Sequence, residues 1–97
     1  MTKVTLKNGF KCEINEQLLT DYEVMELYTK MYDPESTDSD VAVAVTKLVN
    51  IIFGKNKRAL LESCRNKKTG IIPAEKPAEC LGEVLTKLEA VEAAKKS

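Results

Sequence analysis

The stretch from Asp40 to Gly54 reads DVAVAVTKLVNIIFG and is the one long segment in which apolar residues dominate. One apolar stripe recurs along it at helical spacing, formed by Val41, Val45, Leu48, Val49 and Ile52. Further apolar residues widen this stripe towards most of the circumference: Ala42, Val43, Ile51 and Phe53. A helix that is apolar on most sides must be covered on most sides. We therefore expect residues 40–53 to form a central helix around which the rest of the chain packs.

The totals are those of one small domain without a strong net charge. The chain has 97 residues, of which 43% are apolar, so we expect a single domain 1–97 with a modest core. Its 15 basic and 15 acidic residues cancel, and it therefore lacks the positive field that attracts proteins to nucleic acid. A charge near zero also offers little resistance to self-association. The central stretch is too short for a membrane span, which needs about 20 apolar residues. We expect self-association, and neither a nucleic-acid nor a membrane partner.

The three cysteines, Cys12, Cys64 and Cys80, are widely separated in the sequence. The chain contains no histidine and no Cys-x-x-Cys pair, which argues against a structural zinc site. We expect three free thiols that pack in or near the core of a protein kept in a reducing cytoplasm. The N-terminus MTKVTLKNGF has no apolar signal-peptide core.

Residues 3–14 have the pattern of a β-hairpin around Asn8 and Gly9. Apolar residues alternate on both sides of the turn, namely Val4 and Leu6 before it and Phe10, Cys12 and Ile14 after it. A two-residue turn would place these two sets on opposite faces, whereas a three-residue loop pairs Leu6 with Phe10. Because a one-residue slip turns a whole strand over, we predict the three-residue loop, with Gly9 left-handed. The apolar face must then lie on the helices or meet another subunit's sheet.

Three further helices are predicted, over residues 21–32, 55–66 and 74–94. The pair Thr20 and Glu23 has the spacing of a capping box at the start of the first of these. Asp38 or Ser39 is expected to cap the central helix. The last helix carries a clean apolar stripe made of Leu81, Leu85 and Leu88.

Two apolar residues, Ile71 and Ile72, fall inside the loop before the last helix. We expect them to fill the core or to form a short strand. Taken with the helices and the hairpin, the sequence predicts a mostly α fold with a small N-terminal β-hairpin (α+β). Its architecture is expected to be a compact bundle of about four helices around the central helix 40–53.

The chain has none of the residue patterns that support catalysis. Without histidine, Ser63 and Cys64 have no visible general base, and the glycines do not form a phosphate-binding loop. We expect a protein that is not an enzyme and that uses no cofactor and no metal. A DNA-binding regulator is one alternative, because the helices around Gly54 could mimic a helix-turn-helix, although the second helix lacks a clear basic recognition pattern.

The order of these signals resembles the small tail assembly chaperones encoded by long-tailed phages and prophages of Gram-positive bacteria. The matching pieces are KVTLKNGFKCEINEQLLTDYEVMELY at residues 3–28, LVNIIFG at residues 48–54 and LLESCR at residues 60–65. A turn with Gly70, the pair Ile72-Pro73 and a terminal amphipathic helix follow in the same order. The resemblance covers most of the chain as a pattern of lengths and residue types. The acidic segment 33–40 and Pro77 depart from it.

This resemblance implies a binding protein. Chaperones of this family bind the tape measure protein, a very long apolar helical chain that fixes tail length. They keep it soluble while tail tube subunits polymerise around it, and they do not remain in the mature virion. The implied setting is the host cytoplasm, with many copies on one tape measure chain and the tail tube protein as a further partner.

The family often makes a longer second product by a ribosomal frameshift near the end of the short reading frame. Lys95 and Lys96 can be encoded by a slippery run of adenines, which would allow such a frameshifted form. A solubilising lysine tail after a helix is the other interpretation of the same two residues.

The candidate partner-binding residues are the methionine and tyrosine side chains of helix 21–32 and the outward apolar side chains of the central helix. They are Met25, Met31 and Tyr32, with whichever of Val43, Ile51 and Phe53 the fold leaves outside. Methionine suits adaptable partner surfaces, but such a stripe also suits a core. A different small interaction or regulatory adaptor is the main alternative function.

Overall fold

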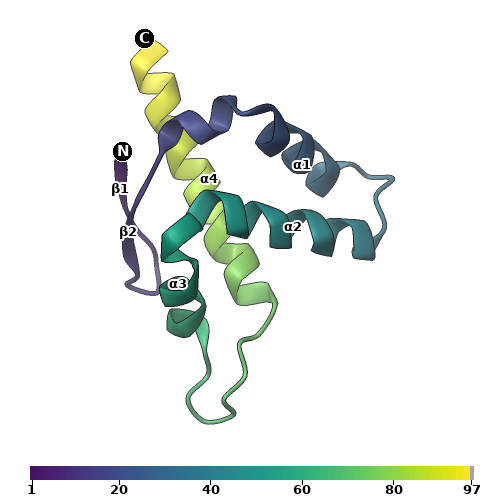
Figure 1. The fold of residues 1–97 in the computed structure, drawn as a ribbon, viewed down its shortest axis with the longest axis vertical. Coiled ribbons are helices and arrows are strands. Elements are labelled where there is room, and N and C mark those ends of the chain that lie inside the picture. Colours follow the sequence, from purple (N-terminus) through teal and green to yellow (C-terminus); the bar gives the residue numbers. More distant parts are fainter. Residues whose placement is uncertain (97) are drawn as a thin grey trace.

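The computed structural model describes residues 1–96, with side chains up to residue 91. The elements follow in the order β1 (Thr2–Thr5), β2 (Lys11–Ile14), the 3-10 turn η1 (Glu16–Thr20), α1 (Tyr22–Tyr32), α2 (Asp38–Phe53), the 3-10 turn η2 (Gly54–Asn56), α3 (Lys57–Cys64) and α4 (Glu75–Lys96). The fold is mostly α with an N-terminal antiparallel hairpin, which confirms the predicted class (Figure 1). Within residues 1–96, no helix has both the length and the apolarity to cross a bilayer.

The hairpin has the predicted register. Val4 pairs with Cys12, and the Leu6 N–H donates to the Phe10 carbonyl at 2.8 Å. Gly9 closes the three-residue loop with a φ of 91°. Because this register places both apolar sets on one face, Val4, Leu6 and Ile14 are all buried.

Replacing Gly9 with valine should lower the free energy of unfolding by about 1–2 kcal/mol, because a β-branched residue is strained at this positive φ. A Cβ built at Gly9 meets no atom within 4 Å, so the loss comes from backbone strain and not from a clash. Urea denaturation measures it. Gly82→Ala is the control: its Cβ also meets nothing within 4 Å, yet it lies inside α4 and should gain about 0.5–1 kcal/mol. Equal effects at both sites would contradict the left-handed turn.

The hairpin docks on the helices of its own chain. The Lys7 N–H donates to the Glu83 carboxylate of α4 at 3.0 Å, and the Asn8 amide donates to the Ser63 hydroxyl of α3 at 3.2 Å. At the other end, the Asn56 amide donates to the Glu13 carbonyl at 3.2 Å. The apolar face of the hairpin was expected to lie either on the helices or against another subunit's sheet. In the structure it lies on the helices.

Both predicted helix caps are wrong by one or two residues. The Asp21 carboxylate caps α1 by accepting from the Val24 N–H at 3.1 Å, because Thr20 belongs to η1 and its hydroxyl donates to the Gln17 carbonyl instead. Thr37 caps α2 and forms a reciprocal capping box with Asp40, with bonds of 3.1 and 3.2 Å. The central helix therefore begins at Asp38.

The core lies where the second half of α2 meets α4. The largest fully buried side chains include Leu48 and Phe53 of α2, Leu60 of α3 and, from α4, Leu81, Val84, Leu85 and Leu88. The predicted stripe of α4 is thus the surface on which the other elements pack. Pro77 sits in the first turn of α4, where a backbone N–H has no helical partner to lose.

The loop between α3 and α4 is held by its own hydrogen bonds. The Arg65 guanidinium donates to the Gly70 carbonyl at 2.6 Å, and the Asn66 N–H donates to the Ile71 carbonyl at 2.8 Å. The expectation that the two isoleucines fill the core or form a short strand is wrong for Ile71, which is 61% exposed and is not part of a strand. Ile72 is half-buried. Ile71 therefore lies at the surface of this closed loop.

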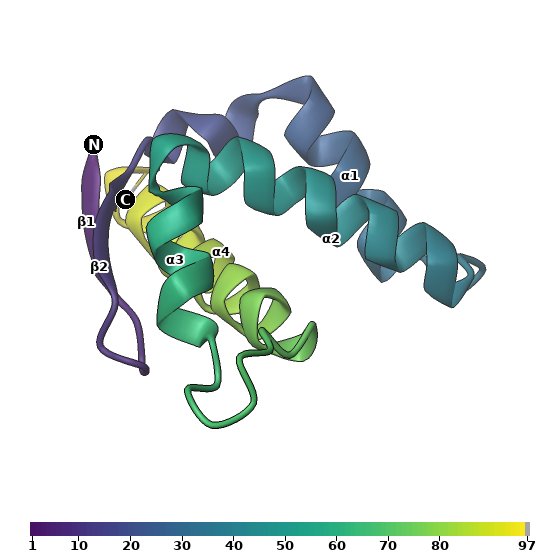
Figure 2. The same cartoon turned by 60° about the horizontal axis from the view of Figure 1, so that its bottom comes forward.

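The helices α1 and α2 together form an arm that projects from the rest of the molecule, with residues 33–37 at its far end (Figures 1 and 2). We call this pair the α1–α2 arm. In the first half of α2, the side chains of Ala42 and Val43 are exposed and those of Val41 and Val45 are half-buried. α2 is therefore enclosed mainly along its second half, and its first half has α1 as its neighbour.

Candidate partner-binding surface

Exposed large apolar side chains gather on the α1–α2 arm. Among the described side chains, the exposed large apolar ones are Met1, Tyr22, Met25, Tyr32, Val43 and Ile71. Four of these six belong to α1 or α2. Apolar side chains exposed singly are normal, but a group on one element pair indicates a contact surface.

A groove of about 680 Å³ runs between α1 and α2. We call it the α1–α2 groove. Its apolar lining comes from Tyr22, Met25 and Leu27 of α1 and from Val43 and Ala44 of α2. Met25 is 53% exposed and Val43 is 50% exposed. Two of the predicted partner-binding residues, one from each helix, therefore line the same groove.

A second hollow of about 510 Å³ extends the groove along α2. It shares Glu26, Leu27 and Lys47 with the first hollow and adds Ile51, which is half-buried. Residues 43, 47 and 51 follow one another at helical i, i+4 spacing and so share one face of α2. The two hollows thus form one continuous strip on the arm.

Acidic groups outnumber basic groups around the strip. The charged side chains that line its two hollows are Glu23, Glu26, Lys30, Asp33, Asp40 and Lys47. Hydrogen bonds from the backbone N–H and the hydroxyl of Thr37 lower the pKa of Asp40, which favours its charged form. The rim therefore carries a local negative excess although the whole chain is neutral.

The structure places the remaining predicted residues elsewhere. Phe53 is only 1% exposed and belongs to the core, so it is not a surface residue. Met31 is half-buried against the core cluster. Tyr32 is exposed but its ring packs on Tyr28, with ring centroids 4.8 Å apart. Neither Met31 nor Tyr32 is among the residues that line the groove.

Tyr28 marks the side of α1 that faces α4. Its hydroxyl donates to the Glu89 carboxylate of α4 at 3.2 Å. Desolvation raises the pKa of Tyr28, and the hydrogen bond to Glu89 adds to the effect. α1 thus divides into one face that contacts the body of the protein and another that lines the groove.

Tyr22 is the residue that the sequence reasoning missed. It is 69% exposed and lines the groove beside Met25. Its position three residues before Met25 is the signal that could have revealed it, because side chains three apart share a helix face.

Nothing in the described part of the chain gathers three or more His, Cys, Asp or Glu side chains in a way that could hold a metal ion. Comparison with protein-family models, with curated proteins and with solved structures finds no match to this chain. The features that bear on function are therefore the α1–α2 groove and the sequence resemblance.

Proposed function

We propose that this protein is a phage tail assembly chaperone that binds and solubilises the tape measure protein during assembly of the tail tube. The observation that carries the proposal is the gathering of exposed Tyr22, Met25 and Val43 around one groove between two helices. The sequence resemblance to tail assembly chaperones supports the same role.

A groove between two helices suits a third helix. An amphipathic helix binds such a groove with apolar residues spaced at i, i+3, i+4 and i+7, and it would complete a three-helix arrangement with α1 and α2. Covering Met25 and Val43 removes the exposed half of two apolar side chains from water. Complete burial of such a side chain is worth about 1.5–3 kcal/mol, so each contributes about half of that. A long apolar helical chain offers many such segments, so that several copies of the chaperone can coat it.

The rim of the groove suggests the charge of the bound segment. Four carboxylates against two lysines line the two hollows, and complementary charge favours correct encounter and orientation. The preferred segment of the tape measure protein is therefore expected to carry lysine or arginine beside its apolar stripe.

The remaining parts of the proposal follow from the family resemblance. The chaperone acts in the host cytoplasm, self-associates or stacks along the tape measure chain, and is absent from the mature virion. The tail tube protein and a frameshifted longer form of this chain are further partners in the same assembly step.

Co-expression with the cognate tape measure protein tests the proposal. The soluble fraction of the tape measure protein after centrifugation should rise several-fold, because the chaperone covers its apolar surface. Expression of the tape measure protein alone is the control. An unchanged soluble fraction would contradict the proposed function.

The mass of the purified complex separates the chaperone from a one-to-one regulatory adaptor. Light scattering after gel filtration should give several chaperone chains for each tape measure chain. A one-to-one complex with an unrelated protein would favour the adaptor instead.

A further inference from the structure

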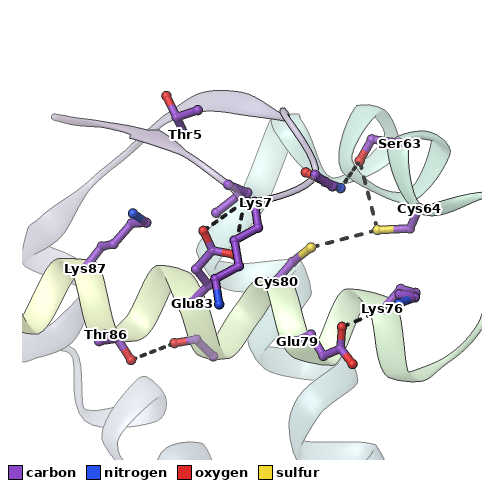
Figure 3. Close-up of a pocket in the computed structure, with 13 residues that line it drawn as sticks. Thr5, Lys7, Ser63, Cys64, Lys76, Glu79, Cys80, Glu83, Thr86 and Lys87 are labelled. Carbon is purple, nitrogen blue, oxygen red and sulfur yellow. Dashed lines mark hydrogen bonds and ion pairs between the residues drawn. The ribbon is translucent and has the colours of Figure 1, made fainter.

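A second groove, of about 930 Å³, lies between the hairpin, α3 and α4, away from the α1–α2 groove. Figure 3 shows the sulfur atoms of Cys64 and Cys80 pointing towards each other in this groove. Their Sγ atoms are 3.9 Å apart, which is van der Waals contact. Both cysteines are free thiols.

The fold brings these two thiols together although 16 positions separate them in the sequence. Cys64 is the last residue of α3 and Cys80 lies in the second turn of α4. Cys80 belongs to the core cluster and Cys64 packs against it. The bonds from Arg65 to Gly70 and from Asn66 to Ile71 hold the connecting loop closed. The proximity is therefore fixed by packing on both sides and by the loop between them.

We propose that Cys64 and Cys80 form a dithiol site that takes a low-molecular-weight disulfide as its oxidant and closes into an intramolecular disulfide. A disulfide requires an S–S distance of about 2.05 Å, so the two sulfurs must approach by roughly 2 Å from their present 3.9 Å. The groove admits the oxidant, because Cys64 is half-buried and lines an opening to solvent.

The reaction is a two-step thiol–disulfide exchange. The Cys64 sulfur, after loss of its proton to solvent, attacks one sulfur of the oxidant and releases the other half as a thiol. The Cys80 sulfur then loses its proton, attacks Sγ of Cys64 and displaces the second half. Two protein thiols are oxidised, and one small disulfide is reduced to two small thiols.

The second step depends on deprotonation of Cys80. Burial, with smaller contributions from Cys64, Glu83 and Glu79, raises the pKa of Cys80 to about 12. The lysines that line the same groove are Lys7, Lys76 and Lys87. Because the thiolate is the attacking form, closure should be slow at neutral pH and faster in alkaline buffer.

Oxidised glutathione added to the dilute purified protein tests the inference. We expect a mass loss of two hydrogen atoms and, in a non-reducing tryptic digest, one cross-linked species joining peptides 59–65 and 69–87. The bond closes a loop of about 15 residues, so the unfolding temperature of the oxidised protein should rise by about 10 °C or more. Reduction should reverse both changes.

Variants of the three cysteines make the test specific. Cys12 lies on β2 and does not line this groove. The Cys12→Ala variant should therefore form the Cys64–Cys80 disulfide to the same extent as the unsubstituted protein. Cys64→Ser and Cys80→Ser should never lose two hydrogens within one chain. Oxidation that stops at a mixed disulfide with glutathione, or a cross-link that involves Cys12, would overturn the inference.

The dithiol site is independent of the proposed function. The two grooves share no lining residue, so closing the disulfide should leave the affinity for a tape measure segment unchanged. Failure of the disulfide test therefore says nothing against the chaperone, and failure of the chaperone test says nothing against the dithiol site.

Discussion

The Phe53→Ala variant should unfold with a free energy about 3–5 kcal/mol lower than that of the original protein. Phe53 is the last residue of α2 and is 1% exposed, within the cluster that joins α2 to α4. Truncating it removes a large buried ring and leaves a cavity that close-packed neighbours fill only in part. Small domains have a total stability of about 5–15 kcal/mol, so this one change should remove a large share of it.

Urea denaturation followed by circular dichroism measures the loss, as a lower midpoint with an unchanged slope. Val43→Ala is the matched control on the same helix, because Val43 is 50% exposed and alanine favours a helix more than valine does. Its effect should stay within about 0.5 kcal/mol. Similar losses for the two variants would mean that Phe53 is not a core residue.

The contrast between Phe53 and Val43 shows where prediction from the sequence ends. Apolar residues surround most of α2, so periodicity could identify the helix but could not decide which side faces the core. That decision depends on where α1 and α4 pack, and α1 covers the first half of α2 on one side only. Phe53 consequently lies inside and Val43 outside, although both widen the same stripe in the sequence.

The hairpin was predictable in more detail than the helices. Side chains alternate with a strict period of two along a strand, and only one loop length placed Val4 and Leu6 on the same face as Phe10 and Cys12. The structure has that register. The ends of the helices were harder to predict, because several neighbouring polar residues could serve as caps. Thr20 does not cap α1, because it belongs to the preceding η1 turn and its hydroxyl donates to the Gln17 carbonyl.

The contact between Cys64 and Cys80 could not be predicted from the sequence. No local pattern connects them, since the contact depends on how the loop of residues 65–74 closes and on how α3 packs against α4. The arm was also not predictable, because hydrophobic periodicity identifies the helices but does not say how α1 and α2 lie relative to the rest of the fold. The groove between them, and with it the role of Tyr22, emerges only from that arrangement.

Replacing Met25 and Val43 together with alanine should weaken binding of a tape measure segment about tenfold or more. Both side chains line the α1–α2 groove and are about half exposed in the free protein. The few residues that dominate an interface lie near its centre and cost more than about 1 kcal/mol when truncated, and about 1.4 kcal/mol corresponds to a factor of ten. Calorimetric titration of the purified protein with synthetic helical segments of the tape measure protein measures the affinity.

Ile71→Ala is the control that distinguishes binding in the groove from non-specific binding to any exposed apolar side chain. Ile71 is 61% exposed, at least as much as Met25 and Val43, but it lies in the loop before α4 and does not line the groove. Its replacement should leave the affinity unchanged, and all these variants should keep their unfolding free energy within about 1 kcal/mol. If Ile71→Ala weakened binding as much as the double variant, any exposed apolar side chain would serve. The α1–α2 groove would then have no special part in holding the partner.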